Sequence, residues 1–218
     1  ICMIKIDNVS YSYAKGGGVS NINLTINDGE FVFLIGPTGS GKTTILRLLY
    51  MDLFPKAGKI TIDKFDSQSI KKRKVPYLRR RVGVIFQNYH LLEDRNLFEN
   101  IALPLHVLGY DKEEIIELVN ESIDEIGLKG KETHYPYELS GGEQQRACIA
   151  RALIKDPDII LADEPTGNLD PVASFEVIKL MEEISKEGTS ILMASHNYNL
   201  IKSRGHRIVE MQNGSVRH

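Results

Sequence analysis

A glycine-rich stretch, Gly36 to Thr44, has the residue types and the spacing needed to hold a triphosphate. It fits the pattern GxxxxGK(S/T) and lies between an apolar run with strand character and a stretch with helical periodicity. Its glycines let the chain turn sharply and bring successive backbone N–H groups to phosphate oxygens. We expect Lys42 to reach between the β and γ phosphates and the Thr43 hydroxyl to bind Mg²⁺. The predicted phosphate-binding residues are Gly36, Pro37, Thr38, Gly39, Ser40, Gly41, Lys42, Thr43 and Thr44.

Two carboxylates follow a second apolar run. The segment Ile159 to Ala162 is typical of a buried strand, and Asp163 and Glu164 come directly after it. Ligands bind at the carboxyl ends of strands in open α/β sheets, so Asp163 suits Mg²⁺ binding and Glu164 could polarise a water for attack on the γ phosphate. Taken alone, two acids after a strand are more often a helix cap or a solvated turn. Together with the glycine-rich loop they predict a site for phosphoryl transfer.

The segment Leu139 to Arg146, Leu-Ser-Gly-Gly-Glu-Gln-Gln-Arg, resembles the signature motif of ABC ATPases. Further positions extend the resemblance in the family's order. Tyr13 resembles the aromatic residue that stacks on adenine, and Gln87 resembles the Q-loop glutamine. Gly167 to Asp170 resembles the D-loop, and His196 resembles the switch histidine. Each alone has an ordinary structural explanation, but their common order indicates an ABC ATPase.

The resemblance implies ATP and Mg²⁺ as cofactors and assigns roles to particular residues. The implied catalytic residues are Glu164, His196, Gln87 and Lys42. The implied metal ligands are Thr43, Gln87 and Asp163. The implied nucleotide contacts beyond the glycine-rich loop are Tyr13, Ser140, Gly141, Gly142 and Asp170.

The signature also implies a pair of chains. Ser140 to Gly142 would open a helix whose amides can bind a phosphate, although the chain already has one complete phosphate cradle. In the resembled family this second anion site faces the nucleotide of a partner subunit. We therefore expect a homodimer in the ATP state, with two ATP molecules between head-to-tail subunits, and opening of the pair after hydrolysis.

The surrounding pattern predicts the elements that position these residues. Short β-rich stretches separated by glycine turns, among them Val19 to Ile26 and Phe31 to Ile35, suggest an antiparallel β lobe over the first sixty residues. Helical periodicity dominates 88–156, and strands and helices alternate afterwards. We predict an α/β P-loop NTPase of ABC type with a RecA-like core, an antiparallel β lobe and an inserted helical subdomain. The single domain spans 1–218, with 1–87 and 157–218 as the core and 88–156 as the helical signature subdomain.

Composition limits the alternatives. The chain has 218 residues, 42% of them hydrophobic, and a net charge of −2, which argues against a surface built to bind nucleic acid. The two cysteines are too few for a disulfide framework or a zinc site, and no apolar run approaches the ~20 residues that span a bilayer. We expect a cytoplasmic chain, held at the inner face of the cell membrane by a separate integral membrane subunit.

Motif details indicate a branch within the family. Thr166 to Asp170 and Leu78 to Gln87 resemble the branch that contains lipoprotein-release, macrolide-efflux and cell-division ATPases, and they are most similar to the bacterial cell-division ATPases. A lipoprotein or peptide exporter ATPase remains an alternative, because it would share every catalytic residue. A DNA-repair ABC ATPase is a more distant one, since no long coiled-coil or zinc insertion separates Lys42 from Ser140.

A basic run has two possible explanations. Lys71 to Lys74 and Arg79 to Arg81 contribute seven positive charges within eleven residues. They could form a solvated face, or they could meet an anionic membrane leaflet or an acidic segment of a partner.

Overall fold

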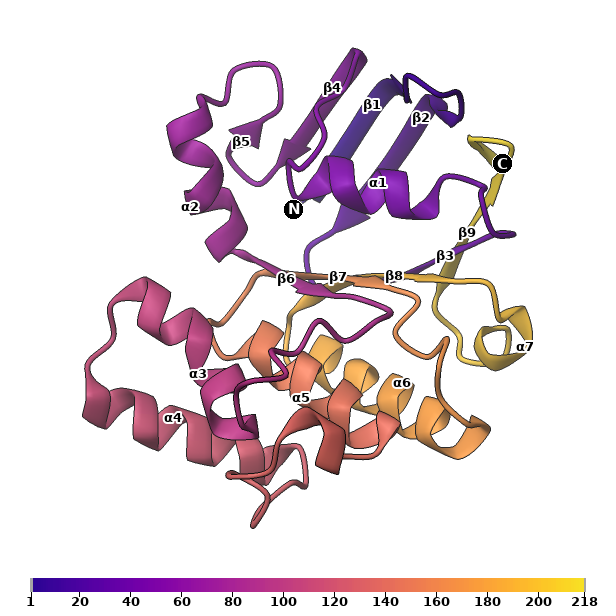
Figure 1. Cartoon of the computed structure of the whole chain (residues 1–218). Helices are drawn as coiled ribbons and strands as arrows, with labels where there is room; N and C mark the ends of the chain where they lie inside the picture. Colours follow the sequence, from indigo (N-terminus) through magenta and orange to yellow (C-terminus); the bar gives the residue numbers. More distant parts are fainter. Residues whose placement is uncertain (1, 218) are drawn as a thin grey trace.

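The computed structural model describes residues 2–217, which form two sheets and a set of covering helices (Figure 1). The strands are β1 (Cys2–Ser12), β2 (Gly18–Asn27), β3 (Phe31–Ile35), β4 (Ala57–Ile62), β5 (Phe65–Asp66), β6 (Val82–Ile85), β7 (Ile159–Asp163), β8 (Ser190–Ser195), β9 (Arg207–Gln212) and β10 (Ser215–Arg217). The helices are α1 (Lys42–Leu49), α2 (Val75–Arg80), α3 (Leu97–Leu108), α4 (Lys112–Glu125), α5 (Gly141–Leu153), α6 (Pro171–Lys186) and α7 (Tyr198–Ile201), with 3₁₀ helices η1 (Lys72–Lys74) and η2 (Pro136–Glu138).

The central sheet has the order β10-β9-β3-β8-β7-β6 and is parallel except for the terminal β9–β10 hairpin. The carboxyl ends of β3 and β7 therefore lie at the same edge of the sheet, with β8 between them. This arrangement brings the glycine-rich loop after β3 towards the two acids at the end of β7. The α/β class is confirmed.

One expectation about β3 was wrong. Its sequence, Phe31 to Ile35, was expected in the antiparallel lobe, but β3 pairs in parallel with β8 and β9. All five of its residues are buried. Such a continuous apolar run is typical of a strand covered on both faces, whereas a strand with one solvated face alternates.

The second sheet is antiparallel, with the order β2-β1-β4-β5. Figure 1 shows α1 between this sheet and the central one. The buried face of α1, including Ile45, Leu48 and Leu49, joins one core with residues of both sheets. This packing fixes the direction of α1 and thus the position of the loop before it.

The opposite face of the central sheet is covered by α5 and α6 (Figure 1). Cys148 and Ile149 of α5 and Val177 and Met181 of α6 share a core with β3, β7 and β8. The N-terminus of α5, which carries the signature residues, is therefore held by the sheet that also positions the phosphate loop.

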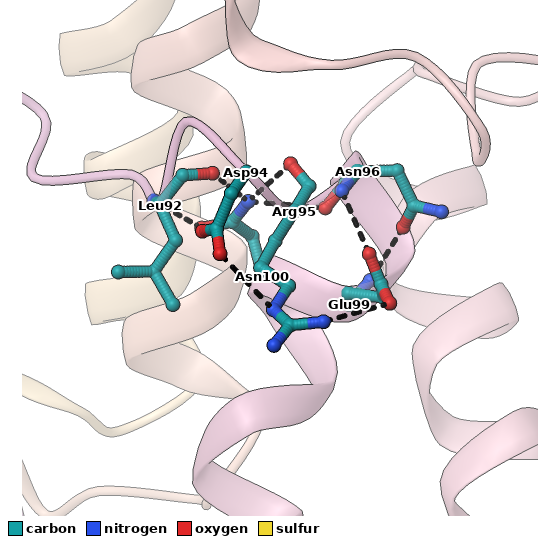
Figure 2. Close-up of polar contacts among 6 residues, drawn as sticks. All are labelled: Leu92, Asp94, Arg95, Asn96, Glu99 and Asn100. Atoms are coloured by element: carbon teal, nitrogen blue, oxygen red, sulfur yellow. Dashed lines mark hydrogen bonds and ion pairs between the residues drawn. The ribbon is translucent and has the colours of Figure 1, made fainter.

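A helical lobe of α3, α4 and α5 has a third core of its own. Its longest helix, α4, has 14 residues, so the described residues contain no long coiled coil. The lobe begins at a pinned loop, shown in Figure 2, where the Asn100 side chain accepts from the Leu92 amide and donates to the carbonyls of Leu92, Arg95 and Asn96. Asn100 is only 1% exposed. The loop leading into α3 thus has a fixed shape.

Within residues 2–217, none of the helices has both the length and the apolar character required to cross a bilayer.

Candidate nucleotide site

The phosphate loop joins β3 to α1 through glycines in the left-handed region of backbone space. Gly36, Gly39 and Gly41 have φ of 155°, 82° and 106°. A Cβ at Gly36 would lie 2.3 Å from the Met211 carbonyl oxygen, and one at Gly41 would lie 2.7 Å from a methyl of Val19. Gly41 is also the N-cap of α1 and offers no side-chain cap to the helix. The first amides of α1 are therefore left for an external anion.

Lys42 lies on the inside of this loop, and its side chain is only 5% exposed. Its Nζ donates to the carbonyl oxygens of Gly36 at 2.8 Å and Pro37 at 3.2 Å. It also lies 3.3 Å from Oε1 of Glu164. The ammonium group thus occupies the centre of the loop, where it can exchange the Glu164 carboxylate for a phosphate oxygen.

Glu164 connects Lys42 with His196. While Oε1 faces Lys42, Oε2 lies 2.5 Å from Nδ1 of His196. Glu164 has a φ of 48°, and its amide donates to the Ala194 carbonyl at the end of β8. The strained turn after β7 directs the carboxylate into the space between Lys42 and His196. Such a carboxylate can accept a proton from a water once Lys42 has moved away.

Asp163 and Thr43 form the part of the site suited to a hard divalent cation. Burial raises the pKa of the Asp163 carboxyl, against a hydrogen bond from the Thr43 side chain that lowers it. Oδ1 of Asp163 is buried without a hydrogen-bond partner. In the described chain, no three His, Cys, Asp or Glu side chains come together as a metal cluster. Carboxylate and hydroxyl oxygens are the ligands that Mg²⁺ prefers, and Mg²⁺ usually completes its shell with phosphate and water oxygens.

The other end of the site is aromatic. The Tyr13 ring packs edge-on against Tyr11 with centroids 5.0 Å apart, and its hydroxyl lies 3.3 Å from Oγ1 of Thr44. The turn after Tyr13 closes through a hydrogen bond from the Tyr13 amide to the Gly17 carbonyl. Tyr13 can therefore offer a ring face beside the phosphate loop.

These residues surround one pocket of about 470 Å³. The sequence-predicted members of its lining are Tyr13, Thr38, Gly39, Gly41, Lys42, Thr43, Thr44, Gln87, Asp163, Glu164 and His196. Gly17 and Gly18 also line it and were not predicted as site residues. Gly36, Pro37 and Ser40 shape the loop: Gly36 and Pro37 accept from Lys42, and the Ser40 hydroxyl is buried without a partner.

The predicted signature residues lie in a different hollow. Ser140 caps α5 by accepting from the Glu143 amide, and Gly141 and Gly142 form the first turn. The hollow, about 420 Å³, shares no lining residue with the first pocket. Asp170 lines this second hollow and caps α6, instead of reaching the phosphate loop of its own chain.

Arg146 is a site candidate that the sequence reasoning missed. It lines the signature hollow one helical turn after Gly142, and its Nε is buried without a partner. Its Nη1 lies 3.6 Å from Glu176. A cation at the mouth of a hollow with free helix amides suits an anion, and its spacing from Gly142 was the available signal.

Gln87 links the two regions. Its carbonyl accepts from the Asn168 side chain at 3.2 Å, and its side-chain amide packs against Gly167. Two residues later, the Tyr89 carbonyl accepts from the Arg151 guanidinium on α5. The segment after β6 is thus fixed both to the turn after β7 and to the signature helix, so movement at the phosphate end can reach α5.

Comparison with known proteins gives consistent results. The family model described as "ABC transporter" matches residues 19–167. The chain is 41% identical over 215 residues to the cell division ATP-binding protein FtsE of Bacillus subtilis, covering 98% of this chain and 94% of that protein. It is 43% identical over 216 residues to FtsE of Mycobacterium tuberculosis, with the same coverage. FtsE of Escherichia coli is 42% identical over 215 residues, with 98% and 97% covered.

Solved structures show the same fold. The dimeric ATP-binding cassette MJ0796 in a post-hydrolysis state with ADP and Pi has a TM-score of 0.88 and 33% identity, covering 99% of this chain and 97% of that one. CbiO1 of Clostridium perfringens, described as part of the ABC transporter complex CbiONQ, has a TM-score of 0.90 and 26% identity, covering 100% and 87%.

Proposed function

The chain belongs to the ABC transporter family as one of its ATPases, and from this membership we propose that it drives a membrane complex of bacterial cell division by closing and opening as an ATP-dependent pair. The single observation that carries the ATP chemistry is one pocket that contains the glycine-rich loop, Lys42, Asp163, Glu164 and His196 together. The three relatives named cell division ATP-binding protein FtsE support the division role.

The proposed hydrolysis begins with a change of partner at Lys42. In the structure Lys42 pairs with Glu164, and an arriving γ phosphate, with more negative charge, draws the ammonium group away. Oε1 of Glu164 is then free to take a proton from the attacking water, while His196 holds Oε2 and fixes the direction of the carboxylate. Gln87 lies in the same pocket wall and can contact the water or the γ phosphate.

We propose Mg²⁺ as the cation of this site. It would offset the charge of the β and γ phosphates, and Thr43, Asp163 and Gln87 are the residues that would hold it. The unpartnered Oδ1 of Asp163, beside the Thr43 hydroxyl, supports this choice.

The functional unit is proposed to be a homodimer. The signature hollow has free helix amides and Arg146, but it is separate from the pocket of its own chain, so its phosphate must come from a second copy. The dimeric state of the cassette MJ0796 with bound ADP and Pi supports a paired unit. Each ATP would then lie between the phosphate loop of one chain and the signature of the other.

The proposed membrane partner is an integral subunit of FtsX type, which would keep the chain at the cytoplasmic face of the membrane and pass the closing motion to cell-wall hydrolases. Affinity purification of the chain from detergent-solubilised membranes tests this. We expect capture of a membrane protein with four transmembrane segments, and a division defect when the chain is depleted. Capture of a lipoprotein-release or macrolide-export subunit, with normal division after depletion, would contradict the proposal.

A further inference from the structure

The seven cations of the basic run divide into two groups. Arg79 donates to the carbonyl oxygens of Tyr50 and Met51, both at 3.1 Å, and so caps the C-terminal end of α1. Arg81 pairs with Asp63 and Asp158, which joins the antiparallel sheet to β7. These two arginines are explained by the fold.

The other five cations have no such role. Lys71, Lys72, Arg73, Lys74 and Arg80 are all exposed, and within residues 2–217 none of them pairs with a carboxylate. Unpaired exposed cations also occur elsewhere in the described chain, such as Lys112 and Lys186, but they lie far apart in sequence, whereas these five lie within ten residues. Five uncompensated positive charges on a chain of net charge −2 form a strong local concentration.

An aromatic ring lies among these cations. Tyr77 on α2 is 50% exposed, with Nζ of Lys74 4.8 Å and the Arg80 guanidinium 5.1 Å from its ring centroid. Val75 and Leu78, on the opposite side of the same helix, are 8% and 0% exposed and anchor it to the core. The helix therefore holds Tyr77 outward, at the surface.

This corner is remote from the nucleotide. Figure 1 shows α2 at the outer edge of the molecule, beside the C-terminal end of α1, whereas the phosphate loop precedes the N-terminal end. None of the five cations lines the nucleotide pocket or the signature hollow. Their charge cannot be explained by contact with the bound ATP.

We propose that Lys71, Lys72, Arg73, Lys74, Tyr77 and Arg80, here called the basic corner, contact the anionic headgroup surface of the membrane. The lysine-rich composition suits a fluid surface of like charges, because the long side chains can each find a phosphate without fixed geometry. An exposed tyrosine is a residue typical of the headgroup level, where one end of the ring is apolar and the other wet. The inference rests on the proposed placement of the chain beside a membrane subunit, and adds a direct lipid contact to it.

Vesicle co-sedimentation of the purified chain tests the proposal. Vesicles of phosphatidylcholine alone are compared with vesicles of equal parts phosphatidylcholine and phosphatidylglycerol. We expect binding to the second kind only, weakening as salt is raised. Each neutralised cation should weaken binding about fivefold, which corresponds to about 1 kcal/mol. The variant with all five cations changed to glutamine should therefore lose more than about a hundredfold in affinity.

Two further variants make the test specific. The matched control changes five exposed lysines elsewhere to glutamine, namely Lys112, Lys129, Lys179, Lys186 and Lys202. It alters the net charge equally and should keep most of the binding. Tyr77→Ser changes no charge and should weaken binding severalfold. The ATPase rate should be unchanged in all three variants.

Equal loss in the five-lysine control, or equal binding to both kinds of vesicle, would overturn the proposal. The proposal would also fail if neutralising the basic corner weakened binding to the membrane subunit while lipid charge had no effect on vesicle binding. That result would indicate an acidic protein segment as the partner. If the wild type bound a DNA oligonucleotide but not vesicles, and the five-glutamine variant lost that binding, the partner would be nucleic acid and the proposal would fail. If the membrane subunit still co-purifies while vesicles do not bind, only the lipid contact fails and the proposed function stands.

Discussion

Changing Glu164 to glutamine should have opposite effects on stability with and without nucleotide. Without ATP, Lys42 loses the carboxylate that faces it at 3.3 Å, while its two bonds to the Gly36 and Pro37 carbonyls remain. Glutamine keeps the size of the side chain and can still bond to His196. It also has the same backbone cost as glutamate at the positive φ of this position. The change therefore isolates the charge.

The magnitude follows from burial. The Lys42 and Glu164 side chains are 5% and 14% exposed, and removing one partner of a well-buried pair costs about 3–5 kcal/mol. The two retained carbonyl bonds, and relief of the repulsion between Glu164 and Asp163, reduce this to about 2 kcal/mol. For a chain of 218 residues, that loss lowers the melting temperature by about 4–8 °C.

Thermal unfolding followed by circular dichroism, with and without saturating Mg-ATP, measures both effects. With ATP, the variant should melt at a higher temperature than the wild type, because a carboxylate beside the γ phosphate is repulsive and the amide is not. The matched control is Asp124→Asn, which breaks an exposed, solvent-screened pair with Lys129 and should leave the melting temperature nearly unchanged. The reasoning is refuted if Glu164→Gln leaves the nucleotide-free melting temperature unchanged, or if ATP shifts the wild type and the variant equally.

Three further predictions concern single residues. Lys42→Ala should abolish tight ATP binding in isothermal titration calorimetry, because the loop loses its cation; an affinity within threefold of wild type, roughly 0.7 kcal/mol, would contradict this. Asn100→Ala should cost about 2–4 kcal/mol in urea unfolding, because the Leu92 loop loses four hydrogen bonds at a buried position, and a cost below about 1 kcal/mol would be inconsistent with that pinning. The hydrogen bond from Lys131 is the main cause that lowers the pKa of Glu143 to about 2. Glu143 should therefore stabilise the fold fully above its unfolded pKa of 4.5, and this contribution should be lost as the pH falls towards 2. Urea unfolding should therefore show wild type more stable than Glu143→Gln by about 1–2 kcal/mol at pH 6, with the gap more than half closed at pH 3; a gap that stayed constant would count against the ion pair.

The sequence was sufficient for the residues of the phosphate loop because that motif is local. Strand, glycine turn and helix are contiguous from Phe31 to Leu49, and the structure has them in that order. The assignment of Phe31 to Ile35 to the wrong sheet shows the limit of local patterns. A short apolar run predicts a buried strand, but its partners β8 and β9 lie more than 150 residues away in sequence.

Contacts within the site depended still more on long-range packing. The pairing of Lys42 with Glu164 requires that β3 and β7 end at the same sheet edge, which spacing along the chain does not specify. The separation of Asp170 from the phosphate loop follows from its place as the cap of α6. Arg146 lies four residues after Gly142, a spacing that places both on one face of a helix, so this residue was predictable from the sequence.

The three neighbouring arginines of the basic run have different roles in the structure, although their charge pattern in the sequence treats them alike. In sequence, Arg79, Arg80 and Arg81 are equivalent neighbours. In the fold, Arg79 donates to backbone carbonyls and Arg81 pairs with two half-exposed carboxylates. Arg80 lies beside the Tyr77 ring and pairs with no carboxylate among the described residues. Because α2 has a buried side and an exposed side, alternate residues of the run meet different surroundings.

In the proposed mechanism, ATP joins two copies of this chain through the signature of each. Analytical ultracentrifugation of Glu164→Gln with Mg-ATP tests it most directly. We predict a species of twice 24.5 kDa that returns to monomer when ATP is removed. The added change Gly142→Asp should leave ATP binding intact and prevent the dimer, since an acid suits the start of α5 but repels a phosphate. If Glu164→Gln bound ATP and stayed monomeric, or if Gly142→Asp did not weaken the dimer, ATP would not join the two copies through the signature.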